Sequence, residues 1–198
     1  SIPEMVNALG FAFATTSYST NGLAVRQGIE DVRDLVHIFS ATHGQPGYVY
    51  LVGASEGGII TTLAVEQFPE VFDGGLATCG PIGDFCRQVN YWGDFRVVFD
   101  YFFPGLIPGS PINVPQQVID NWDTIYLPGV RAAIRSNRQA TDQLLRVTRA
   151  PIDKSNPASV EETILGLLWY NVFATNDGIA KLGGQPFDNM NRGYSGST

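Results

Sequence analysis

The first eighty residues alternate between hydrophobic patterns of helix type and of strand type. Between residues 23 and 40, apolar side chains recur every three or four positions, which predicts an amphipathic helix. Short runs of apolar, β-branched and aromatic residues at 10–15, 48–52 and 75–79 predict strands. Strands that alternate with helices are typical of a parallel sheet, so we expect an α/β fold over residues 1–81.

After Pro81 the pattern changes, and no clear strand alternation follows. An aromatic-rich stretch at 87–103 and a segment with four prolines at 104–115 come first. Proline interrupts helices and strands, so the segment at 104–115 is expected to be irregular. Residues 82–198 are therefore predicted to form a mainly α-helical segment, with helices at 87–103, 115–124, 128–136, 140–149 and 160–175.

The strongest chemical signal follows the strand predicted at 48–52. The chain reads Gly53-Ala54-Ser55-Glu56-Gly57, and a helical pattern begins directly afterwards. A Gly-x-Ser-x-Gly turn between a strand and a helix presents the serine hydroxyl as a nucleophile, with the next backbone N–H as an oxyanion donor. We therefore expect Ser55 to be catalytic, the amide of Glu56 to assist it, and Gly53 and Gly57 to prevent a steric clash.

Two other interpretations of this turn stay open. Ser55 could be a plain helix N-cap in a glycine-rich loop. A phosphate-binding loop is the other, although no Gly-Lys-Ser or Gly-Lys-Thr follows the glycines.

With its flanking patterns, the turn resembles the nucleophile elbow of the α/β-hydrolase superfamily. Residues 8–80 are similar to the middle of that fold, and residues 68–73 resemble the helix exit of many bacterial serine esterases. The helical segment that follows resembles a cap, or lid. The resemblance implies a partial parallel sheet of about three strands at 1–81, a lid at 82–198, a small-molecule ester as substrate, and no cofactor or metal.

A base and an acid are harder to find. His37 and His43 are the two histidines, and both precede Ser55, whereas α/β-hydrolases place the base after the nucleophile. Asp84 could be the acid, or it could cap the first lid helix or line the lid hinge. We therefore expect a central piece of a longer hydrolase, inactive alone and completed by the remainder of the fold. A prolyl-oligopeptidase-like peptidase and a non-catalytic binding module are the alternatives.

Composition narrows the possible partners. The 198 residues are 44% hydrophobic and carry a net charge of −7, which disfavours a nucleic-acid role, and no apolar run has the length of a membrane span. Five arginines between 131 and 149 have helical spacing and are read as a solvated helix face. Cys79 and Cys86 could be a disulfide or two thiols. The location stays open, with an extracellular or periplasmic one favoured.

Overall fold

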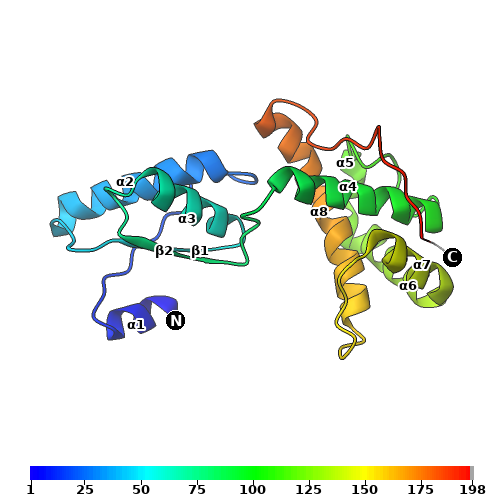
Figure 1. Ribbon diagram of the computed structural model, residues 1–198, viewed down its shortest axis with the longest axis horizontal. Coiled ribbons are helices and arrows are strands. Elements are labelled where there is room, and N and C mark those ends of the chain that lie inside the picture. Colours follow the sequence, from blue (N-terminus) through cyan, green and yellow to red (C-terminus); the bar gives the residue numbers. More distant parts are fainter. Residues whose placement is uncertain (197–198) are drawn as a thin grey trace. The chain divides into compact units, whose positions relative to one another are not determined.

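The computed structural model describes residues 1–196, and the chain divides into two compact units. Unit 1 covers Ser1–Gly83 and unit 2 covers Asp84–Thr198. The sequence prediction placed the division between residues 81 and 82. Each unit has its own hydrophobic core, and each is described separately (Figure 1).

Unit 1 contains a two-stranded parallel sheet with helices on one side. Strand β1 (Tyr50–Ala54) pairs with β2 (Gly74–Thr78), with Tyr50 opposite Gly74 and Ala54 opposite Thr78. Helix α3 (Glu56–Gln67) connects the strands and packs on both, and α2 (Val25–His43) packs on α3. The buried core of this unit consists of Ile29, Val32, Ile60, Ala64 and Phe72.

The predicted fold class is wrong. The structure is 57% helical with only two short strands, so the class is mainly helical and the larger sheet of an α/β-hydrolase is missing from the described residues. The predicted strand at 10–15 forms no ladder, and its residues are exposed. Its composition favours a strand, but extended backbone becomes a strand only by pairing with a neighbour. The segment instead follows α1 (Ile2–Ala8) and places Phe11 edge-on to Tyr50, with ring centroids 6.4 Å apart.

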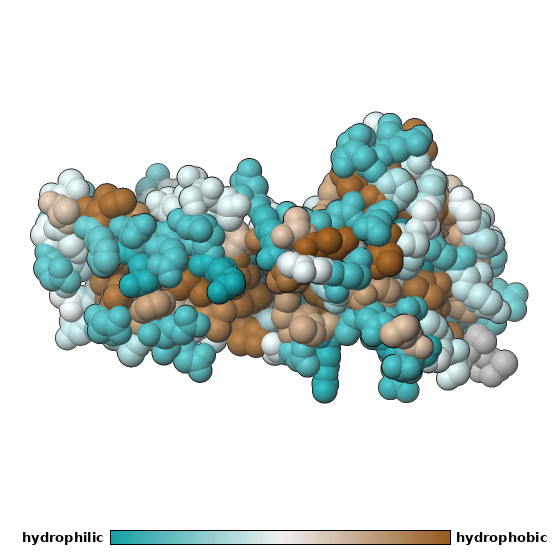
Figure 2. All heavy atoms as spheres, turned by 90° about the horizontal axis from the view of Figure 1, so that it is seen from above, coloured by the Kyte–Doolittle hydropathy of each residue, from teal (hydrophilic) through white to brown (hydrophobic). Residues whose placement is uncertain are grey.

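The side of the sheet away from α3 is apolar and exposed. Tyr50 and Val52 of β1 are 57% and 67% exposed, and Leu76, which pairs with Val52, is 58% exposed. We call these three residues the open face. The opposite, helix-covered side presents many hydrophilic side chains with apolar residues between them (Figure 2). Parallel sheets are usually covered on both faces, so the open face is unusual.

Unit 2 is a bundle of helices. Helix α4 (Phe85–Phe102) packs against α7 (Arg138–Thr148) and α8 (Ser159–Leu182), and α6 (Leu127–Ser136) packs against the same two helices (Figure 1). Helix α5 (Gln116–Asp120) and a π-helical turn, η1 (Trp122–Tyr126), lead into α6. The core is large and includes Phe95, Phe99, Val118, Trp122, Val130, Leu144, Ile164, Leu168 and Val172.

A fully buried arginine fixes the proline-rich segment against this bundle. Arg96 of α4 donates to the Asp100 carboxylate at 2.8 Å, to the side-chain oxygen of Asn171 at 3.3 Å and to the carbonyl of Ile107 at 2.9 Å. Asn171 of α8 in turn donates to the carbonyl of Pro111 at 2.9 Å. Buried charges are retained when they are paired and hydrogen-bonded, and here the pairing orders an otherwise irregular segment.

Candidate active site

Ser55 lies at the junction of β1 and α3, in a backbone conformation that non-glycine residues rarely adopt. Its φ is 55° and its ψ is −122°, and its side chain is exposed. The Ser55 amide donates to the carbonyl of Thr78 in the neighbouring strand at 2.9 Å. The Gly58 amide donates to the Ser55 carbonyl, also at 2.9 Å. These two bonds hold a turn that costs about 1–3 kcal/mol in backbone strain.

The side chain of Ser55 makes no capping hydrogen bond to α3. An ordinary N-cap serine would accept one from the first turn of its helix. The hydroxyl is therefore presented to solvent at the start of the helix, which disfavours the plain N-cap interpretation.

The glycines of the turn have unequal roles. A Cβ atom at Gly53 would overlap the carbonyl of Gly57, and a Cβ at Gly58 would lie 2.9 Å from the Cα of Gly80. A Cβ at Gly57 would meet nothing nearer than the Tyr18 hydroxyl, at 4.0 Å. The steric prediction is thus confirmed for Gly53 and wrong for Gly57, because the close approach behind the turn falls on Gly58.

The backbone amide and the side-chain carboxylate of Glu56 have different roles. Its amide is the first of α3, where helix N–H groups have no intrahelical acceptor and the helix dipole is positive. Its carboxylate accepts a hydrogen bond from the amide of Ala24, the residue that precedes α2. The side chain therefore connects the elbow to α2, and only the amide is available to a developing oxyanion.

Tyr18 is a neighbour of the elbow that sequence reasoning missed. Its hydroxyl lies near Gly57, and its ring is near Gly28 of α2. Burial raises the pKa of Tyr18, and the negative charges of Glu56 and Asp31 raise it further, so the phenol stays protonated. No spacing in the sequence connects residue 18 with residue 57, so pattern analysis had no signal for this contact.

The two histidines lie far from Ser55. Ala24 marks the end of α2 that touches Glu56, and an α-helix rises about 1.5 Å per residue. His37 is therefore about 20 Å and His43 about 28 Å along the helix axis from that contact. Both are exposed, and neither is within hydrogen-bonding reach of the Ser55 hydroxyl.

Asp84 belongs to unit 2, where its carboxylate accepts a hydrogen bond from the Arg87 amide at 3.2 Å as the N-cap of α4. Of the roles predicted for Asp84, the structure shows the helix cap. Cys79 and Cys86 are exposed free thiols. Among residues 1–196, no group of three or more potential metal ligands comes together.

Comparison of the chain with protein-family models, with curated proteins and with solved structures finds no match. Within the described part of the chain, no helix combines the length and the apolar character needed to cross a bilayer. The chemistry of the site rests on its own residues, which are an exposed serine hydroxyl on a strained turn and the first backbone amide of α3 beside it.

Proposed function

We propose that Ser55 is the nucleophile of a serine hydrolase that acts on carboxylic esters. The observation that carries this proposal is the positive φ of an exposed serine between a parallel strand and a helix. Strained backbone is retained where function requires it, and glycine would relieve the strain at this position. The resemblance of the turn to an α/β-hydrolase nucleophile elbow supports the same role.

In the proposed reaction, the Ser55 Oγ attacks the ester carbonyl carbon while a base removes its proton. The amide of Glu56 donates to the oxyanion that forms, and the alcohol leaves to give an acyl-serine that water hydrolyses. The base and its orienting acid are supplied by protein outside residues 1–196, since neither histidine reaches Ser55. One oxyanion donor is typically worth a factor of about 10²–10³ in rate.

A non-catalytic binding module is the second candidate, and the distance of both histidines from Ser55 favours it. Such a protein would keep the turn without activating the hydroxyl. The two candidates differ in one measurable property, the reactivity of Ser55 towards an acylating or phosphonylating reagent when a base is available.

The test uses a fluorophosphonate with and without imidazole, which can act as an exogenous base in place of the missing histidine. We expect imidazole to accelerate formation of one covalent adduct, which peptide mapping places at Ser55. Ser55→Ala should abolish the adduct, and Ser17→Ala, which removes another exposed serine of unit 1, should leave it unchanged.

Absence of the adduct at every imidazole concentration, with unit 1 folded, would favour the binding module. Equal labelling of Ser17 and Ser55 would also contradict the proposal, because it would show ordinary surface reactivity.

A further inference from the structure

Within unit 1 (Ser1–Gly83), three non-glycine residues have a positive φ, and one of them is Tyr18. The φ angle is 56° for Tyr18, 55° for Ser55 and 52° for Cys79, which directly follows β2. A left-handed backbone is uncommon for a side chain as bulky as that of tyrosine. Because backbone strain is retained mostly where function requires it, the conformation of Tyr18 points to a requirement on where its side chain lies.

The loop that carries Tyr18 is fixed on both sides of this residue. The Tyr18 amide donates to the Oγ1 atom of Thr16 at 3.2 Å. Ser19 donates twice to the Asp31 carboxylate of α2, from its amide at 2.8 Å and from its hydroxyl at 3.0 Å. Tyr18 therefore lies in a hydrogen-bonded turn held against α2, and its side chain has a defined direction.

The side chain of Tyr18 extends from this loop to the first turn of α3. Its ring packs against the core of unit 1, near Gly28 of α2. Its hydroxyl lies 4.0 Å from the position that a Cβ at Gly57 would occupy. Gly57 directly follows Glu56, whose amide is the first donor proposed for the oxyanion. Tyr18 is partly exposed, and its hydroxyl is not one of the fully covered polar atoms of unit 1.

The phenol of Tyr18 is a hydrogen-bond donor at neutral pH. Burial raises its pKa, and the negative charges of Glu56 and Asp31 raise it further, so the proton stays on the oxygen. The same two carboxylates disfavour another negative charge nearby, so an oxyanion at the elbow needs donors that offset them. The amide of Glu56 supplies one hydrogen bond, and tyrosine hydroxyls are among the groups that supply another in oxyanion holes.

We propose that Tyr18 is a catalytic residue that donates a second hydrogen bond to the oxyanion formed at Ser55. This inference rests on the function proposed above for Ser55. As the Ser55 Oγ adds to the ester carbonyl carbon, negative charge gathers on the carbonyl oxygen, and the hydrogen bonds from the Tyr18 hydroxyl and the Glu56 amide strengthen. Tyr18 keeps its proton throughout, because the base takes the proton of Ser55 and passes it to the leaving alcohol.

The test is the rate at which a fluorophosphonate labels Ser55 with imidazole as the base. The Oγ–P bond forms, the P–F bond breaks, fluoride leaves, and imidazole takes the proton, while negative charge on the phosphonyl oxygen needs the same donors. Tyr18→Phe removes the hydroxyl and keeps the ring, so it should slow labelling about 10²-fold. Ser19→Ala loosens the loop without changing the tyrosine and should slow labelling about five-fold, which keeps the test valid if Tyr18→Phe disturbs the fold.

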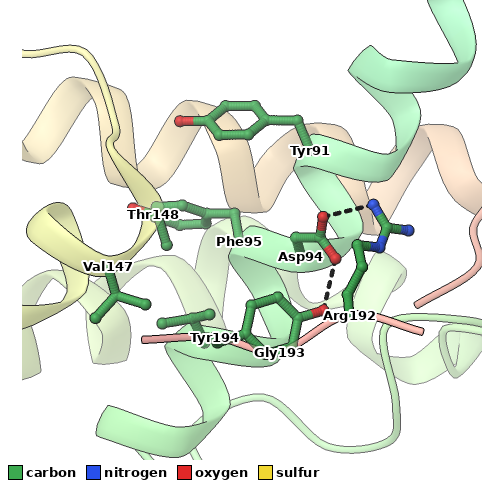
Figure 3. A pocket seen from close by; sticks show the side chains of 9 residues that line it. Tyr91, Asp94, Phe95, Val147, Thr148, Arg192, Gly193 and Tyr194 are labelled. Atoms are coloured by element: carbon green, nitrogen blue, oxygen red, sulfur yellow. Dashed lines mark hydrogen bonds and ion pairs between the residues drawn. The ribbon is translucent and has the colours of Figure 1, made fainter. Parts of the chain in front are cut away.

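Two further tyrosine variants separate a catalytic role from a structural one. Tyr48→Phe removes an exposed hydroxyl just before β1, at the end of that strand away from Ser55. Tyr194→Phe removes a structural hydrogen bond of unit 2, where the Tyr194 hydroxyl donates to Asp94 at 2.6 Å in the wall of a cavity (Figure 3). Neither variant should change the labelling rate, although Tyr194→Phe should lower the stability of unit 2.

The phosphorus NMR shift of the finished adduct is an independent measurement, because it changes when the phosphonyl oxygen loses a hydrogen bond. We expect Tyr18→Phe to change this shift and Tyr48→Phe to leave it unchanged. Absence of an adduct at Ser55 in the unsubstituted protein would overturn the function proposed for Ser55 and the role of Tyr18 together. If the adduct forms, an unchanged rate and shift in folded Tyr18→Phe, or an unchanged rate in Ser19→Ala where Tyr18→Phe is unfolded, would overturn the role of Tyr18 alone.

Discussion

At the scale of single residues, the backbone at Ser55 is the most informative feature. Its φ of 55° and ψ of −122° correspond to the first central position of a type II′ turn, which glycine favours. A serine there keeps a hydroxyl exposed at the cost of conformational strain. Backbone strain of this kind lowers the stability of the folded state. Replacing the serine by glycine, which adopts these angles freely, should therefore raise the free energy of unfolding.

We therefore expect Ser55→Gly to raise the free energy of unfolding of unit 1 by about 1 kcal/mol. Ser55→Ala keeps the Cβ and should give no such gain, which makes it the control. Urea denaturation followed by far-UV circular dichroism measures the difference. Equal stability of the two variants would show that the turn is unstrained.

The glycines of the elbow offer a second comparison of neighbouring substitutions. Gly53→Ala should destabilise unit 1 by about 3 kcal/mol, because its Cβ would overlap the Gly57 carbonyl, which cannot move without distorting α3. Gly57→Ala adds a methyl group in open space within a helix and should stabilise by about 0.5 kcal/mol. Denaturation midpoints would check both, and destabilisation by Gly57→Ala would contradict the described turn.

Much of the candidate site could be predicted from local sequence, because the elbow is a local structure. The strand, the turn and the helix around Ser55 follow one another within twenty residues, so their patterns are readable. The contacts of the Glu56 carboxylate with Ala24 and of Tyr18 with the turn join distant positions. Hydrophobic periodicity carries no information about such pairs.

At the scale of elements, one glutamate joins two helices of unit 2. Glu161 of α8 accepts hydrogen bonds from Arg131 and Arg135, which lie one turn apart on α6. The arginines interpreted as a solvated face therefore include two with a defined partner. Burial alone would raise the pKa of Glu161, but the hydrogen bonds and charges of Arg135 and Arg131 outweigh it and lower the pKa.

This connection predicts a pH dependence. A carboxyl whose pKa is lowered by folding stabilises the protein above its unfolded pKa of 4.5, and that stabilisation is lost as the pH falls through the lower, folded value. Glu161→Gln should cost about 0.5–1 kcal/mol at pH 7, and less at pH 3, since the pair is partly exposed. Urea midpoints at the two pH values measure it, with Glu162→Gln, an exposed neighbour, as control. A loss independent of pH would exclude the ion pair as the cause.

The helices of unit 2 and two of the three strands predicted in unit 1, at 48–52 and 75–79, were largely predictable, and the third strand, at 10–15, was wrong. Apolar spacing predicted helices at 128–136 and 140–149, close to the observed α6 and α7. A helix satisfies its own backbone, so its pattern is enough. The segment at 10–15 has strand composition but no strand beside it, and one sequence window cannot reveal whether a partner exists.

At the scale of the whole molecule, the two units have unequal cores. The core of unit 1 contains Ile29, Val32, Ile60, Ala64 and Phe72, whereas the larger of the two clusters in unit 2 already includes nineteen buried residues. Burial of apolar surface is the main favourable term in folding, so unit 1 should be the less stable unit.

Chemical denaturation should therefore show two transitions. All three tryptophans, Trp92, Trp122 and Trp169, lie in unit 2, so tryptophan fluorescence reports on that unit alone. Circular dichroism reports on both units. We expect the circular dichroism signal to begin to change at a lower urea concentration than the fluorescence. Coincident curves would mean that the units unfold as one.

The open face of unit 1 also affects how the protein behaves in concentrated solution. Tyr50, Val52 and Leu76 form an exposed apolar surface that can associate with another molecule. In a sheet of two strands each strand is also an edge, which can pair with a strand of another chain. The net charge of −7 keeps molecules apart by mutual repulsion. Added salt screens that repulsion but does not change the open face, so the protein should associate more readily as the ionic strength rises.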